Sequence, residues 1–176
     1  IYEPASRVFI GEEPHIEIRV RNNQRKYLKA LHINPIEGYK GQHGLWFQNE
    51  QIDLNKELVA IIGNKGSGKS ALTDIIGLLG NSHNQKYKRS EEELFSFLNK
   101  EKFLRKNCAS NFEGELHWYA GTPDKKTLNA TVDEGLPESL EYIPQKYLEK
   151  ICANIDDDEF RHKLNAVIFG YVEDAK

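Results

Sequence analysis

The stretch Gly63-Asn-Lys-Gly-Ser-Gly-Lys69-Ser70 decides how the chain is interpreted, because it fits the pattern G-x-x-x-x-G-K-[S/T]. Glycines give such a loop backbone conformations that are closed to residues with a Cβ atom, and they let the backbone approach a phosphate closely. The amides of residues 65–70 then point into one concavity, an anion-binding nest. A following helix adds the positive end of its dipole. The motif therefore predicts a binding loop for a nucleoside triphosphate.

The residues of this loop have separate expected roles. Lys69 reaches the β- and γ-phosphates and takes part in catalysis, and the Ser70 hydroxyl is a hard oxygen ligand for Mg²⁺. ATP and Mg²⁺ are the expected cofactors, although no adenine-reading residue can be named from the sequence. The residues expected to contact the nucleotide are Gly63, Asn64, Lys65, Gly66, Ser67, Gly68, Lys69, Ser70 and Ala71.

The segments on either side of the loop have the required character. Leu58–Ile62 is a continuous apolar run, which predicts a central strand covered on both faces. From Ser70 onward the apolar residues recur at helical spacing and form one stripe, and Gly80-Asn81 ends the predicted helix. The stripe consists of Leu72, Ile75, Ile76 and Leu79. These flanks predict an α/β fold of the P-loop NTPase class.

Further elements follow from periodicity and turn residues. Alternating apolar residues predict antiparallel strands before the central one, at His15–Val20, Tyr27–Ile33, Leu45–Phe47 and Gln51–Leu54. A hairpin is expected from Gly114–Ala120 and Thr127–Val132, with its turn at Gly121–Asp124, and a short strand at Leu140–Ile143. Helices are expected from a capping box at Ser90, at Gln145–Ala153 and at Asp157–Tyr171.

Bulk composition restricts the class of protein. The apolar fraction of 39% and the formal net charge of −3 describe a globular chain without wholesale electrostatic attraction to nucleic acid. No apolar run approaches the length of a membrane helix, and no targeting segment opens the chain, so a cytoplasmic location is expected. Cys108 and Cys152 lie in unrelated contexts and are expected to be reduced. Because the chain starts at Ile1 and has no methionine, it is expected to be a fragment of a longer protein.

Other classes of P-loop protein fail on their second motifs. The nearest match to a GTPase base-reading motif, Asn99-Lys-Glu-Lys102, has the wrong final residue. No apolar strand ending in Asp-Glu follows the loop, and the acidic run Asp156–Glu159 is interpreted as a helix start. The basic residues between Gln85 and Asn107 are interpreted as a solvated helical face rather than a contact with a polyanion.

The segment Leu140-Glu-Tyr-Ile-Pro-Gln145 ends at a glutamine 76 residues beyond Lys69. In this arrangement the chain resembles the ABC-type ATPase heads of the SMC, RecF and RecN families. The resemblance implies that Gln145 is the Q-loop glutamine, which contacts Mg²⁺ and the attacking water. Most similar in pattern are the TrlF-like ATPases, through the segments Arg7–Pro14, Ala60–Ser82, Phe95–Phe103 and Tyr142–Cys152.

This resemblance implies a head lobe with a mixed sheet, an antiparallel N-terminal β part and an inserted helical segment. Residues 1–25 would be a linker or the end of an upstream phosphoesterase domain, 26–172 the N-terminal lobe, and 173–176 the start of a coiled coil. Implied partners are a second lobe or head in a dimer, DNA, and a phosphoesterase or nuclease domain or subunit. None of the six histidines forms a pair at metal-ligand spacing, so a phosphoesterase metal site is expected outside the chain.

The Ser-Gly-Gly signature and the Walker B Asp-Glu of ABC-type heads do not occur in the chain. The expected function is therefore the ATP-binding lobe of an SMC-like ATPase in DNA repair or phage defence. MgATP binding would drive head engagement, with little hydrolysis by this chain alone. Two alternatives stay open: another P-loop nucleotide switch or phosphotransferase, and a nucleic-acid-binding module that uses the basic segment 85–107.

Overall fold

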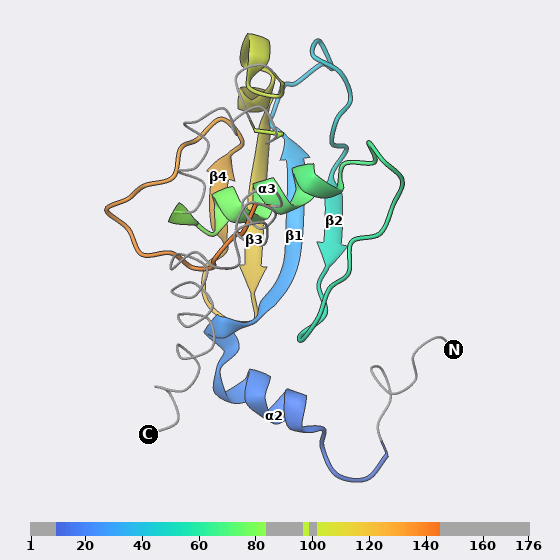
Figure 1. The fold of residues 1–176 in the computed structure, drawn as a ribbon, viewed down its shortest axis with the longest axis vertical. Helices are drawn as coiled ribbons and strands as arrows, with labels where there is room; N and C mark the ends of the chain where they lie inside the picture. The colour runs from blue at the N-terminus through green and yellow to red at the C-terminus, as the bar shows by residue number, and fades with distance from the viewer. Residues whose placement is uncertain (1–9, 84–96, 99–101, 145–176) are drawn as a thin grey trace, which may run out of the picture.

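The computed structural model describes residues 10–83, 97–98 and 102–144. Within these ranges the chain is a mixed α/β fold built on one four-stranded sheet (Figure 1). None of the helices in these ranges combines the length and the apolarity that crossing a bilayer requires. The elements in chain order are α2 (His15–Asn22), η1 (Gln24–Lys26), β1 (Leu28–Pro35), β2 (Glu50–Asp53), α3 (Lys69–Leu79), η4 (Arg105–Asn107), η5 (Ala109–Asn111), β3 (Phe112–Trp118) and β4 (Asp124–Thr127).

The sheet has the strand order β2-β1-β3-β4, and each neighbouring pair is antiparallel. Leu31 of β1 lies opposite Ile52 of β2 and Leu116 of β3, so an apolar row crosses the middle of the sheet. Strands β1, β2 and β3 confirm the strands predicted over 27–33, 51–54 and 114–120. The expected mixed sheet is not formed by the described residues, because the predicted central strand does not join it.

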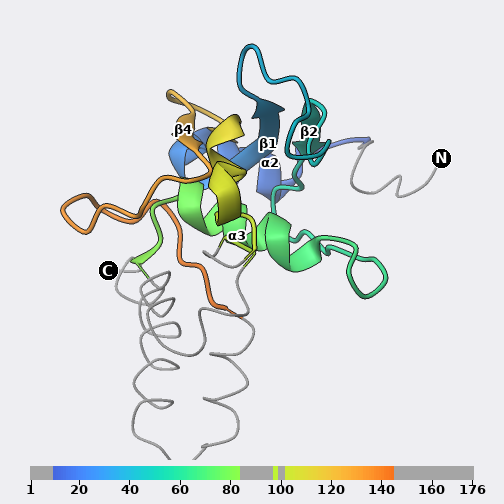
Figure 2. The same cartoon turned by 90° about the horizontal axis from the view of Figure 1, so that it is seen from above.

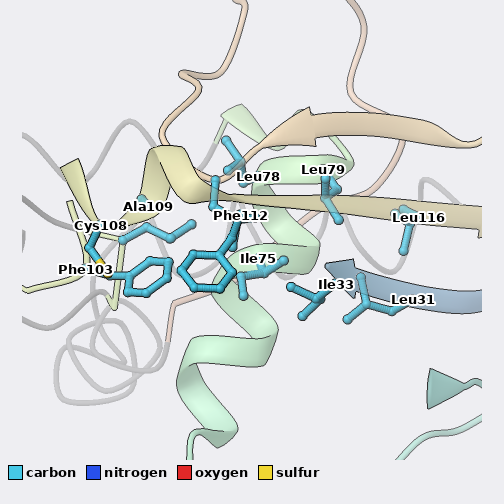
Figure 3. Close-up of a cluster of buried hydrophobic side chains, with 12 residues drawn as sticks. Leu31, Ile33, Ile75, Leu78, Leu79, Phe103, Cys108, Ala109, Phe112 and Leu116 are labelled. Atoms are coloured by element: carbon cyan, nitrogen blue, oxygen red, sulfur yellow. The ribbon is translucent and has the colours of Figure 1, made fainter. Parts of the chain in front are cut away.

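Helix α3 lies across one face of the sheet, and no other helix of the described residues is as long (Figures 1 and 2). The helix confirms the prediction made from the apolar stripe after Ser70. Gly114 of β3 allows the close approach, because a Cβ atom there would lie 2.9 Å from Leu79 Cδ1. The fully buried residues between helix and sheet include Leu31, Ile33, Ile75, Leu78, Leu79, Phe112 and Leu116 (Figure 3). Each such side chain contributes roughly 1.5–3 kcal/mol by leaving water.

An aromatic cluster extends this core toward the start of α3. The rings of Phe97 and Phe103 are stacked with centroids 4.4 Å apart, and Phe103 lies 5.5 Å from Phe112. Trp46 meets Phe103 edge to face at 5.6 Å. The loop between β1 and β2 is thereby fixed against residues that follow α3 in the chain.

The C-terminal end of α3 is enclosed by residues 126–142. Gly80 is the C-cap, as predicted, and the next residue, Asn81, has a positive φ of 56°. Its side-chain amide donates to the carbonyls of Asp133 and Leu136, and its Oδ1 accepts from Lys126 Nζ at 3.0 Å. Because Asn81 is buried, these bonds replace the water that its amide would otherwise bind.

The predicted edge strand His15–Val20 is wrong, because these residues form helix α2. Ile16 and Val20 are four residues apart, so the segment satisfies a helical period as well as alternation. Only Val20 is buried, and ion pairs from Glu17 to Lys56 and from Arg19 to Glu57 hold the helix beside the chain after β2. With no strand alongside to supply ladder hydrogen bonds, the helix satisfies its own backbone.

Three further predicted strands are also wrong. Leu45–Phe47 is irregular, since the preceding loop closes on itself through Tyr39, whose hydroxyl donates to the Gly44 carbonyl. In place of Thr127–Val132, β4 occupies Asp124–Thr127, and a turn follows in which the Ala130 amide bonds to the Thr127 carbonyl. Leu140–Ile143 forms no strand because its hydrogen bonds go to the end of α3, including Tyr142 N to Ser82 Oγ at 2.9 Å.

The predicted central strand Leu58–Ile62 is not formed either. These residues have no regular structure, and Leu58 and Ile62 expose 81% and 91% of their surface. A strand buried on both faces needs neighbours to bond its backbone and cover its side chains. No strand of the described residues pairs with this segment. The predicted helices Gln145–Ala153 and Asp157–Tyr171, and the capping box at Ser90, lie outside the described residues.

Candidate functional site

The glycine-rich loop and the start of α3 form the candidate site. The Lys69 side chain turns back over the loop, and its Nζ atom donates to the carbonyls of Gly63 and Asn64, each at 2.8 Å. A turn inside the loop is closed by the Ser67 amide, which bonds to the Asn64 carbonyl at 3.2 Å. The ammonium group is therefore held across the loop by the loop's own backbone.

Three glycines of the loop are needed for distinct geometric reasons. Gly66 and Gly68 have φ values of +84° and +89°, and a Cβ atom at either would meet no heavy atom within 4 Å, so the need is conformational. This left-handed region costs other residues about 1–2 kcal/mol. Gly63 differs, because a Cβ atom there would clash with Ser67 Oγ. Each glycine of the motif thus has a local cause in the fold.

The first turn of α3 supplies hydrogen-bond donors beside the Lys69 ammonium. Gly68 is the N-cap and has no side chain that could bond the first helical amides. The first hydrogen bond of the helix runs from the Leu72 amide to the Gly68 carbonyl. The amides of residues 69–71 precede this bond and have no intrahelical acceptor. Ser70, in the same turn, is exposed. Free backbone amides, the Lys69 ammonium and the exposed Ser70 thus belong to one helix turn, a combination suited to a polyphosphate and a hard cation.

The predicted strand before the loop does not position it. Residues 58–62 are irregular and mostly exposed, so the loop is held by α3 and by the Lys69 bonds instead. Ile61 is the partly buried member of the segment, and it lines the hollow beside the loop. The predicted loop residues lie directly before α3, whereas the support expected from a central strand is absent within the described residues.

A cavity of about 1150 Å³ opens beside the loop. The loop and the start of α3 contribute residues 66–69 and 71–72 to its lining, and aromatic rings form another part of its wall. Trp46 is 55% exposed, and its indole nitrogen donates to the His43 carbonyl at 2.8 Å, which fixes the ring at the rim. The aromatic lining residues are Trp46, Phe47, Phe97 and Phe103. Sequence reasoning missed this wall, because its members come from separate stretches of the chain.

Basic residues line the same cavity. Lys102, Arg105 and Lys106 face it together with Lys69. These three residues belong to the basic segment that the sequence analysis interpreted as a solvated helical face. The other four basic residues of that segment lie outside the described residues: Lys86, Lys88, Arg89 and Lys100. Four cationic side chains around one hollow make it attractive to a multiply charged anion.

Gln145, the predicted Q-loop residue, lies outside the described residues, but the segment before it is anchored to α3. The Tyr142 hydroxyl donates to Asp74 Oδ1, and Asp74 Oδ2 accepts from the Phe97 amide at 2.6 Å. Burial, followed by the nearby Asp74 charge, raises the pKa of Tyr142. The phenol is consequently a neutral donor to the buried carboxylate at physiological pH.

The structure also brings together two histidines that the sequence did not pair. His32 and His117 lie within reach of each other and of Glu115 on neighbouring strands. No two histidines lie at metal-ligand spacing along the sequence, and the strand register brings these two together across the sheet. Sequence spacing could not reveal the pair, because its members are 85 residues apart.

Comparison of the chain with protein-family models, with curated proteins and with solved structures finds no significant match. Functional inference consequently depends on the geometry of the loop, the cavity and the residues around them.

Proposed function

We propose that the chain binds MgATP at residues 63–71 and is the nucleotide-binding lobe of an SMC-like ATPase. The observation that carries the proposal is the position of Lys69, whose Nζ atom lies 2.8 Å from the carbonyls of Gly63 and Asn64. This arrangement places a cation over a loop whose left-handed glycines shape a concavity, next to the open amides of α3.

Binding would proceed by exchange of hydrogen-bond partners. The Lys69 ammonium would leave the two carbonyls and bond the β- and γ-phosphate oxygens, since a phosphate adds the attraction of an opposite charge that a neutral carbonyl does not offer. The amides of residues 66–71 would hold the remaining oxygens. Ser70 would supply one oxygen ligand to Mg²⁺, and Gln145 would contact the ion and the attacking water, as the resemblance to ABC-type heads implies.

Trp46 is the residue we assign to the base. Its exposed ring lines the same cavity as the loop, and its bond to the His43 carbonyl limits its rotation. A preorganised aromatic face stacks on a nucleobase with little loss of entropy and with no preference among bases. In this proposal the loop recognises the triphosphate of ATP. Trp46 holds the base by stacking and does not distinguish adenine from other bases.

Hydrolysis needs groups that this chain does not contain, namely the signature and the Walker B carboxylate. We propose that a second lobe or head supplies them, so that MgATP joins two ATPase units in a DNA-repair or phage-defence assembly. The isolated chain is then expected to bind MgATP weakly and to hydrolyse it very slowly.

The proposal is tested by measuring the Kd for MgATP by calorimetry. Lys69→Ala should weaken binding at least about tenfold, because it removes the charge-assisted bonds to the phosphates. Lys29→Ala is the matched control, since Lys29 is an exposed lysine on β1 that does not line the cavity. Ser70→Ala should reduce the dependence of the Kd on Mg²⁺ while leaving Mg²⁺-free binding nearly unchanged. Equal affinities of the Lys69 and Lys29 variants would contradict the proposal.

A second function, direct binding of nucleic acid, is favoured by one observation, the presence of Lys102, Arg105 and Lys106 on the same cavity. Phosphate contacts by these residues would give salt-dependent DNA binding in the absence of nucleotide. The triple variant Lys102→Gln, Arg105→Gln, Lys106→Gln separates the two functions. If DNA is the main ligand, the variant loses DNA binding while Lys69→Ala retains it. If MgATP is the main ligand, Lys69→Ala has the larger effect on nucleotide affinity.

A further inference from the structure

The face of the sheet that points away from α3 carries a cluster of polar residues. Leu31 and Leu116 are buried under α3, and side chains alternate between the two faces of a strand. His32 on β1, and Glu115 and His117 on β3, therefore lie on the opposite face. His32 stands directly opposite Glu115, while His117 stands opposite Ala30, one pair further along the ladder. Cross-strand neighbours of this kind lie within side-chain reach.

The ligand-capable atoms of the three residues converge. One ring nitrogen from each histidine and one carboxylate oxygen of Glu115 all lie within 4.8 Å of one another. His117 Nε2 lies 3.2 Å from Glu115 Oε2, and the two imidazole ring centroids are 4.2 Å apart. Around a tetrahedral zinc ion, neighbouring nitrogen and oxygen ligands lie about 3.3 Å apart, as bond lengths near 2.0 Å require. Small rotations of half-buried side chains would close the remaining difference.

Neighbouring residues prepare Glu115 for this role. Lys125 Nζ donates to Glu115 Oε1 at 2.9 Å and to Glu113 Oε1 at 2.7 Å, which leaves Oε2 turned toward His117. Within the described residues, the ring nitrogens of His32 make no hydrogen bond, so its lone pair is available to an ion.

We propose that His32, Glu115 and His117 form a binding site for a divalent transition-metal ion, with zinc as the natural choice. Two imidazoles and a carboxylate are borderline ligands that suit Zn²⁺ and Co²⁺, whereas Mg²⁺ prefers an all-oxygen set. Three protein ligands leave a fourth tetrahedral position open to water or to an exogenous anion. The site is separate from the nucleotide loop, because it lies on the other face of the sheet.

The test is titration of the whole, chelator-treated chain with ZnSO₄ alone, monitored by calorimetry and by thermal unfolding. We expect one equivalent to bind and to raise Tm, because a ligand that binds the folded state stabilises it by mass action. Co²⁺ should give the visible bands of a four-coordinate ion. His32→Ala, His117→Ala and Glu115→Gln should each weaken zinc binding at least about a hundredfold. Metal-free Tm values establish that each variant is folded.

Controls distinguish this site from general binding by histidines and from the loop. His15→Ala removes an exposed histidine of α2 and should leave zinc affinity unchanged, as should Lys69→Ala. The proposal is overturned if the wild-type chain binds no stoichiometric zinc, or if the His32 and His117 variants bind it as well as His15→Ala.

Discussion

The hydroxyl of Tyr142 donates a hydrogen bond to Oδ1 of Asp74, a carboxylate that is buried in the middle of helix α3. The same carboxylate accepts the Phe97 amide through its other oxygen. Two segments that follow α3 in the chain are thereby attached to the helix that begins at the phosphate loop. A buried carboxylate is tolerated there because both of its oxygens have donors.

Replacing Tyr142 by Phe should lower the free energy of unfolding by about 1–2 kcal/mol at pH 7, because it leaves one oxygen of Asp74 without its donor. The pKa of Tyr142 is raised in the folded state, mainly by burial. Its stabilisation is therefore complete below the unfolded pKa of about 10 and is lost as the pH rises above that value. Urea unfolding of both proteins between neutral pH and about pH 11 should show the wild-type advantage shrinking only in the alkaline range. Parallel stability curves across that range would contradict this assignment.

Asn81→Ala should destabilise the chain by about 2–4 kcal/mol, because it removes a buried amide that bonds several groups at once. The groups left without partners include the Lys126 ammonium and the Asp133 amide. Asn81→Gly is the informative comparison, since glycine tolerates the positive φ at this position while losing the same side-chain bonds. Urea unfolding should rank the three proteins wild type, then glycine, then alanine. A loss below about 0.5 kcal/mol in the alanine variant would show that the network adds little stability.

Gly66→Ala tests whether the shape of the loop matters beyond overall stability. Gly66 and Gly38 have φ values of +84° and +82°, and neither would bring a Cβ atom within 4 Å of another heavy atom. Alanine at either position should therefore cost a similar amount of stability, about 1 kcal/mol. Only Gly66→Ala should weaken MgATP binding, since Gly38 lies in the loop after β1. Equal MgATP affinities of the two variants would show that the conformation of the loop does not affect nucleotide binding.

Intrinsic fluorescence should report nucleotide binding through Trp46. The chain has two tryptophans, and Trp118 lies on β3, where its indole nitrogen bonds Asp124 Oδ2 at 2.9 Å. MgATP should change the emission of wild type and of Trp118→Phe, and the signal should vanish in Trp46→Phe. Trp46→Ala should also weaken binding about fivefold, which corresponds to about 1 kcal/mol of lost stacking. An unchanged signal in Trp46→Phe would place the base elsewhere.

Elements with strong local signals were predictable from the sequence. Helix α3 combines an apolar stripe with a glycine at its end. In β1 and β3, buried and less buried residues alternate, because α3 covers one face of the two strands. Helix α2 was mistaken for a strand because Ile16, Ile18 and Val20 also alternate. For a segment of only eight residues, neighbours in space decide which period is used.

The candidate site was predictable only where it is local in the chain. The loop residues follow from one motif, because conformation and close approach demand glycine at those positions. Trp46 and Arg105 face the loop through tertiary packing, and His32 and His117 meet through strand register, which no spacing rule encodes. The strand predicted at residues 58–62 shows the same limit, since composition indicates what a strand can bury but not whether a neighbour is present.

The pentapeptide Leu58-Val-Ala-Ile-Ile62, exposed apart from the partly buried Ile61, has a consequence for handling the protein. Short, uncharged, β-branched segments with a free backbone are templates for edge-to-edge stacking of identical copies. Lys65 flanks it on one side, where its charge opposes the approach of a second copy, whereas Lys56 and Glu57 on the other side are paired with Glu17 and Arg19 of α2. Salt screens such charges, so we expect the purified chain to self-associate as ionic strength rises, and a Val59→Lys variant to stay monodisperse.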